Sequence, residues 1–150
     1  MQARFTVRAD KISPDLAKKI RAAKSPRPVL QAAGLQIVSM AKRAFTDSAL
    51  RPTPWAPRKD PRKTHSLLRK TGTLWQSIGI KKLTDKSVSA GTDRPYGSVH
   101  QLGSRKATGR GGGIPPRPYL PFTRQGQLTP LAAQRIEAVM RAKLNSLFKP

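Results

Sequence analysis

Apolar residues recur at helical spacing in three stretches of the chain. The first begins at Ser13-Pro14-Asp15, where a hydroxyl, a proline and an acid mark a helix start. The second runs from near Pro28 to about Phe45, and the third begins at Thr129-Pro130. Their apolar faces contain Leu16, Ile20 and Ala23; then Leu30, Gly34, Ile37 and Ala41; then Leu131, Ile136, Val139, Met140, Leu144, Leu147 and Phe148. One apolar face on each predicts helices that pack on a core, of which the second and third are the main ones.

Alternating apolar and polar positions predict strands elsewhere. Residues 3–8 alternate, and residues 74–80 carry a mostly apolar face at every second position after a Thr-Gly turn. A hairpin turn at 84–86 leads to a second strand at 87–92. The order of helix, loop, antiparallel strands and helix predicts an α+β fold in one domain, residues 1–150. In it, two main helices pack on one face of a small antiparallel sheet, and long basic loops project from the body.

Two stretches have no such pattern. Residues 46–66 contain four prolines among many cations, and residues 104–113 are basic and rich in glycine. We predict flexible surface loops there, disordered in the monomer and folding on assembly. Trp55 lies between prolines in the first loop. It either anchors the loop to the body or contacts a partner.

The segments that flank the second loop are short and stiff. Residues 95–103 fit either a strand or a short helix, whereas residues 114–121 are extended because their prolines lack N–H donors. Arg117 stands in this proline frame, so its guanidinium is held ready for a carboxylate or for main-chain carbonyls.

The charge narrows the choice of partners. Thirty Lys and Arg residues face seven carboxylates, which gives a formal charge of +23. Such a field attracts polyanions whatever the fold. Two alternatives follow: contact with nucleic acid, or a place against an acidic protein or near packaged nucleic acid that the chain does not read.

The residues required for catalysis are scarce. There is no cysteine, the two histidines are far apart, and seven acids leave little for paired-carboxylate chemistry. Ser98, His100 and Asp93 are neighbours in sequence, which does not make a triad, and Gly109–Gly113 lacks the Lys-Ser/Thr and the helix of a phosphate loop. We predict no enzyme, no metal and no cofactor. No apolar run has the length of a membrane span or signal peptide, so we expect no membrane partner and synthesis in the cytoplasm.

Four motifs in order resemble the phage virion morphogenesis family, the tail-completion proteins of contractile-tailed phages and prophages. They are Trp55-Ala56-Pro57, Leu68-x-x-Thr71-Gly72-x-Leu74-x-x-Ser77-Ile78, Tyr96-x-x-x-His100-Gln101-x-Gly103 and Ile114-Pro115-x-Arg117-Pro118-Tyr119-Leu120, and the resemblance covers roughly residues 28–145. The family commonly has alanine where Gly97 and Pro116 stand, phenylalanine where Tyr119 stands and glycine where Pro121 stands.

The resemblance implies a structural virion protein, acting in tail completion or head–tail joining like a tail terminator. It implies a ring-forming homo-oligomer near the DNA channel that contacts other tail or neck proteins, assembled in the bacterial cytoplasm and retained in the virion tail or neck. The segments 96–103 and 114–120 would build part of the sheet and an inter-subunit contact. The residues expected at that contact are Trp55, Tyr96, His100, Gln101, Gly103, Pro115, Arg117, Pro118, Tyr119 and Leu120. The cations expected to face DNA without reading it are Arg58, Lys59, Arg62, Lys63, Arg105, Lys106 and Arg110. The alternative function is a basic nucleic-acid-binding module with no role in the virion.

Overall fold

A computed structural model describes residues 3–8, 13–23, 25–105 and 113–148. The described elements, in chain order, are β1 (Ala3–Arg8), α1 (Pro14–Ala22), α2 (Arg27–Arg43), the short 3-10 helix η1 (Ser48–Leu50), α3 (Thr73–Ser77), β2 (Gly79–Leu83), β3 (Ser87–Thr92), α4 (Tyr96–Leu102) and α5 (Pro130–Leu147). The predicted α+β class is confirmed. Within the described ranges, no helix combines the length and the hydropathy needed to cross a bilayer.

The sheet is antiparallel, with strand order β1-β3-β2. β1 pairs with β3 so that Val7 lies opposite Val88 and Phe5 opposite Ala90. These apolar pairs face the core, while the Thr6 and Ser89 hydroxyls are bonded to each other, 2.6 Å apart, on the exposed face. The alternation predicted for residues 3–8 therefore sets the register, because a shift by one residue would turn the apolar side chains outward.

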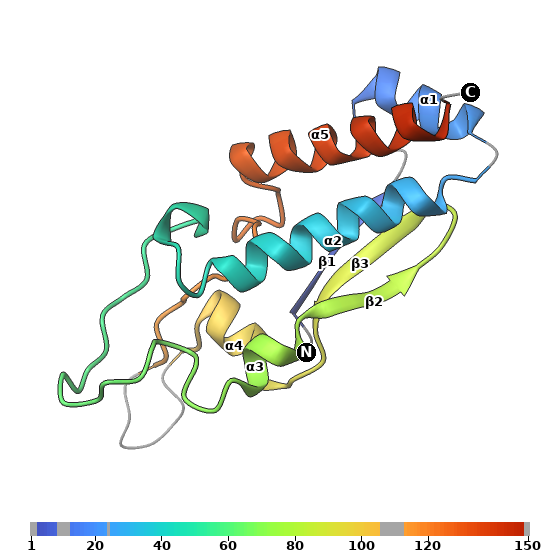
Figure 1. Ribbon diagram of the computed structural model, residues 1–150. Coiled ribbons are helices and arrows are strands. Elements are labelled where there is room, and N and C mark those ends of the chain that lie inside the picture. The colour runs from blue at the N-terminus through green and yellow to red at the C-terminus, as the bar shows by residue number, and fades with distance from the viewer. Residues whose placement is uncertain (1–2, 9–12, 24, 106–112, 149–150) are drawn as a thin grey trace.

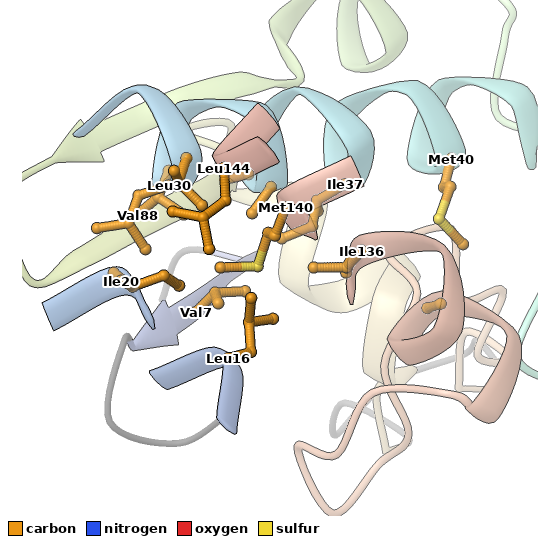
Figure 2. Packing of buried hydrophobic residues seen from close by; sticks show 14 residues of the cluster. Val7, Leu16, Ile20, Leu30, Ile37, Met40, Val88, Ile136, Met140 and Leu144 are labelled. Atoms are coloured by element: carbon orange, nitrogen blue, oxygen red, sulfur yellow. The ribbon is translucent and has the colours of Figure 1, made fainter. Parts of the chain in front are cut away.

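The helices cover the apolar face of this sheet (Figure 1). α2 packs on β3 and β2 and also against α5, and α1 packs against α5. Figure 2 shows side chains from all three helices meeting those of the strands in one core, among them Ile20 of α1, Ile37 of α2, Met140 of α5 and Val88 of β3. Of the two main helices predicted from periodicity, α2 thus packs directly on the strands and α5 packs on α2, and both contribute to one core.

The N-termini of α5 and α1 are held by different hydrogen bonds. The Thr129 hydroxyl accepts a hydrogen bond from the Ala132 amide at 3.3 Å, as expected of a helix cap. Ser13 does not cap α1 with its side chain; its hydroxyl donates instead to Asp15. Arg141 of α5 holds that carboxylate at 3.0 and 3.2 Å, which lowers the pKa of Asp15 to about 2. This ion pair fixes α1 against α5.

A second buried cluster lies at the far end of α2. It contains Phe45, Trp55 and Tyr119, with Leu74, Ile78 and Leu120 around them. The Phe45 ring lies 5.8 Å from that of Trp55 and 5.6 Å from that of Tyr119, centroid to centroid. This cluster connects three parts of the chain that are far apart in sequence.

Two predictions about strands were wrong. Residues 74–80 do not form one strand: Thr73–Ser77 is the helix α3, started by Gly72 at φ +74°, and β2 begins only at Gly79. Leu74 and Ile78 belong to both the two-residue and the four-residue repeat, so their burial together in the second cluster decides the conformation. Residues 96–103 and 114–120 add nothing to the sheet, because the former contain α4 and the latter an extended segment outside any strand.

Candidate assembly surface

α4 and the extended segment after the second loop lie side by side. The Arg117 amide donates to the His100 carbonyl at 2.7 Å, and the Ser104 amide donates to the Ile114 carbonyl at 2.9 Å. The Ser104 hydroxyl accepts from the Ile114 amide at 3.2 Å. Main-chain hydrogen bonds therefore join the third and fourth motifs, residues 96–103 and 114–120, into one structural unit.

Gln101 is the polar centre of this unit. Its buried side-chain oxygen accepts from the amides of Tyr119 and Leu120 at 3.0 and 2.9 Å, and its nitrogen donates to the Leu120 carbonyl at 3.3 Å. An extended segment outside a sheet leaves its main-chain groups unpaired, and burial makes that costly. Gln101 supplies the partners that a neighbouring strand would otherwise provide.

Gly97 and Gly103 allow the close approach. A Cβ at Gly97 would lie 2.3 Å from the Thr92 methyl carbon and 3.0 Å from the Tyr119 hydroxyl, which donates to the Gly97 carbonyl. Gly103 ends α4 at φ +77°, and a Cβ there would lie 2.9 Å from the Ile114 carbonyl oxygen. The Gly103 position thus requires glycine twice, for its dihedral angle and for the space.

The first loop is attached to this unit at two points. The buried Trp55 ring donates its N–H to the Pro118 carbonyl at 2.8 Å, and the Arg51 guanidinium lies 3.8 Å from the ring centroid. Arg117 donates from Nε to the Ala56 carbonyl at 2.9 Å and from Nη2 to the Pro57 carbonyl at 3.0 Å. Trp55 therefore acts as an anchor, and the Arg117 fork binds main-chain carbonyls of the same chain.

The His100 side chain lies beside residues of the first loop, residues 46–66. Its Nδ1 is buried and has no hydrogen-bond partner within the described residues, and its ring lies edge-on to Tyr96 with centroids 6.0 Å apart. Burial, and then the neighbouring Arg117 charge, lower the pKa of His100. The imidazole is therefore held in its neutral form at physiological pH.

A cavity of about 530 Å³ opens beside His100. Cationic and apolar side chains line it together, and no carboxylate of the described residues does. The described lining residues are Arg58, Lys59, Lys63, His65, Leu67, Leu68, Lys70, Thr71, Leu74, Tyr96, His100, Gly113, Ile114, Pro115 and Arg117. Four of the predicted contact residues (Tyr96, His100, Pro115 and Arg117) thus meet three of the predicted DNA-facing cations (Arg58, Lys59 and Lys63) at one hollow.

The other predicted site residues have different surroundings. Pro118, Tyr119 and Leu120 are buried inside the unit, and Arg62 and Arg105 are exposed away from the cavity lining. Lys106 and Arg110 lie outside the described residues. The sequence interpretation overlooked His65, near the end of the stretch without periodicity, and Lys70, inside the second motif.

Ser98 and Asp93, the sequence neighbours of His100, have partners of their own within the chain. The Ser98 hydroxyl donates to the Pro95 carbonyl at 3.4 Å, and Asp93 is paired with Arg4 and with Lys81, the latter at 3.2 Å. Among the residues that the structure describes, no three His, Cys, Asp or Glu side chains gather as metal ligands would. The arrangement is one of contacts and charge.

The sequence model of the phage virion morphogenesis family matches residues 7–145. No curated protein and no solved structure is significantly similar to the chain.

Proposed function

The chain belongs to the phage virion morphogenesis family, and from that membership we propose that it completes the tail or joins it to the head as a ring-forming structural protein near the DNA channel. Membership of the family implies a structural role in building the virion. The site in the tail or neck, the ring and the approach to DNA are our proposal.

One structural relationship supports the proposal above the others. Trp55, Gln101 and Tyr119 come from three separate motifs, and hydrogen bonds draw them into a single rigid unit. Rigid, pre-formed surfaces bind partners at low entropic cost, which suits a protein whose task is contact. The residues left at the surface of this unit, Tyr96 and Ile114 with 41% and 40% of their area exposed, are large and apolar.

The charge supports a polyanionic neighbour. Identical subunits that each carry +23 repel one another, so a closed ring needs either screening or a negative partner. DNA in a central channel supplies that partner without any base being read. The exposed cations of the first loop, Arg62 and Lys63 among them, are candidates for this contact.

The oligomeric state tests the ring. We expect sedimentation velocity and native mass spectrometry to detect one closed oligomer, favoured when salt rises from about 0.15 M to about 1 M and the Debye length falls from about 8 to about 3 Å. DNA or a tail protein would favour it as well. Electron micrographs would then show rings. Monomers alone at every concentration and salt, with tail components present, would rule the ring out.

Binding to DNA separates this function from a nucleic-acid-binding module. We expect affinity to fall steeply with salt and to be equal for unrelated duplexes, since only phosphates are contacted. A preference for one sequence that persists at high salt would favour the module instead.

A further inference from the structure

The cavity beside α4 has a composition that a purely DNA-facing surface does not need. Its lining includes the exposed Lys59, Lys63 and Lys70 and the half-buried Arg58 and Arg117. The same lining includes the apolar side chains of Leu67, Leu68, Leu74, Tyr96 and Ile114. A cavity lined by both cationic and apolar side chains matches a ligand that has both negative charge and an apolar side chain.

The arginines of the cavity are held by main-chain carbonyls. Arg58 donates to the His65 carbonyl, and Arg117 donates to the carbonyls of Ala56 and Pro57. Carbonyls orient a guanidinium and leave its charge in place. The pKa of Arg117 is lowered first by burial and then by the Arg58 charge, so an anion between the two would relieve their repulsion.

Asp60 of the same loop offsets part of this charge, since hydrogen bonds to Arg62, and after them the Lys63 and Arg58 charges, lower its pKa. Asp60 accepts from the Arg62 main-chain and side-chain N–H groups, both at 3.1 Å, and does not line the cavity. The rest of the chain offers little more, since it has seven acids against thirty Lys and Arg residues. A second copy of the chain is therefore a poor match in charge, and a different molecule is required.

We propose that this cavity binds an acidic, apolar peptide segment of another virion protein. Carboxylates of the segment would pair with Lys59, Lys63 and Lys70, and a leucine or aromatic side chain would lie against Tyr96 and Ile114. A DNA duplex presents its phosphates on a convex surface and has no apolar side chain that could contact the apolar residues of the cavity. This inference rests on the proposed assembly function, and it names the chemistry of the partner.

Titration with a defined peptide tests the inference. The probe is a short acetylated and amidated peptide of Glu, Asp, Leu and Phe, followed by amide chemical shifts of the ¹⁵N-labelled protein. We expect saturable shifts at Leu67, Leu68, Tyr96, His100 and Ile114. Either no binding tighter than about 1 mM, or shifts spread evenly to distant cations such as Arg27 and Lys86, would overturn the proposal.

Neighbouring residues of the loop provide a matched pair of variants. Lys63→Glu and Arg62→Glu change the net charge equally, but only Lys63 lines the cavity. We expect Lys63→Glu to weaken the peptide about fivefold or more and Arg62→Glu less than about twofold. Ile114→Ser should weaken the peptide without changing DNA affinity, because the Ile114 side chain is exposed and uncharged. Equal losses in the two Glu variants would contradict the inference.

A short DNA duplex serves as the competing ligand. If it shifts the same cavity amides and displaces the peptide at a similar concentration, nucleic acid is the occupant and the inference fails. Failure here is separable from failure of the proposed function. Ring formation by the unaltered protein, measured by sedimentation without peptide, would still be observed if only the peptide site were wrongly assigned.

Discussion

Tyr119 donates its phenolic hydroxyl to the main-chain carbonyl of Gly97 across 2.9 Å, inside the buried space beneath α4. Burial raises the pKa of Tyr119, so the hydroxyl remains a donor at any ordinary pH. A methyl group on residue 97 would lie 3.0 Å from that oxygen. Gly97 and Tyr119 therefore fit each other, because the hydroxyl occupies space that a methyl group on residue 97 would need.

The first prediction is that these two positions are energetically coupled. Tyr119→Phe should cost about 1 kcal/mol through a lost buried hydrogen bond, and Gly97→Ala about 1–3 kcal/mol through overpacking against the hydroxyl and the Thr92 methyl. The double variant should cost less than the sum, because removing the hydroxyl makes room for the new methyl. Urea denaturation of the four proteins measures the coupling. Strict additivity would show that the two residues are independent.

The second prediction concerns Gln101. Gln101→Leu leaves the buried amides of Tyr119 and Leu120 without an acceptor and the Leu120 carbonyl without this donor. We expect a loss of about 2–4 kcal/mol in the free energy of unfolding. Gln76→Leu, on the exposed face of α3, is the control and should change stability by less than about 0.5 kcal/mol. Similar losses in both variants would mean that the Gln101 contacts contribute nothing specific.

The third prediction concerns the attachment of the first loop. Arg117→Ala removes the bonds to the Ala56 and Pro57 carbonyls, so amide hydrogen exchange across residues 51–66 should accelerate while exchange in α2 and α5 stays slow. Arg117→Lys should restore little, since an ammonium cannot reproduce the fork. Arg124→Ala, on an exposed turn, is the control.

The same variant also tests assembly. If Arg117 holds the loop for an inter-subunit contact, Arg117→Ala should reduce ring formation as well. Normal assembly despite rapid exchange in the loop would restrict Arg117 to a role within the subunit.

The fourth prediction concerns pH. Because the pKa of His100 is lower in the folded state than its ordinary value of 6.5, the unfolded chain binds the proton more readily. The contribution of neutral His100 is complete above about pH 6.5, and stability should fall as the pH drops below that value toward the folded pKa. His100→Gln should flatten this part of the stability profile, measured by urea denaturation at a series of pH values. An unchanged slope in His100→Gln would assign the acid sensitivity to other groups.

Local patterns predicted the helices α1, α2 and α5 and the strands at 3–8 and 87–92, since each has a period that burial on one side requires. The motifs predicted the family, and the composition predicted a cationic protein. The pattern failed at residues 74–80, where apolar residues at alternate positions include a pair four residues apart. There the packing of Leu74 and Ile78 against Tyr119 and Leu120, distant in sequence, selects a helix over a strand.

The sequence by itself determined the fold class, the family and the charge, because these depend on local periodicity, ordered motifs and residue counts. Only the tertiary structure decided that residues 96–103 and 114–120 form a unit outside the sheet, since Gln101 substitutes for a neighbouring strand across eighteen residues of chain. It also decided which cations meet at one cavity. The position of these cations depends on the hydrogen bonds that hold the first loop, from Trp55 to Pro118 and from Arg117 to Ala56. No local sequence pattern encodes a contact between segments about sixty residues apart.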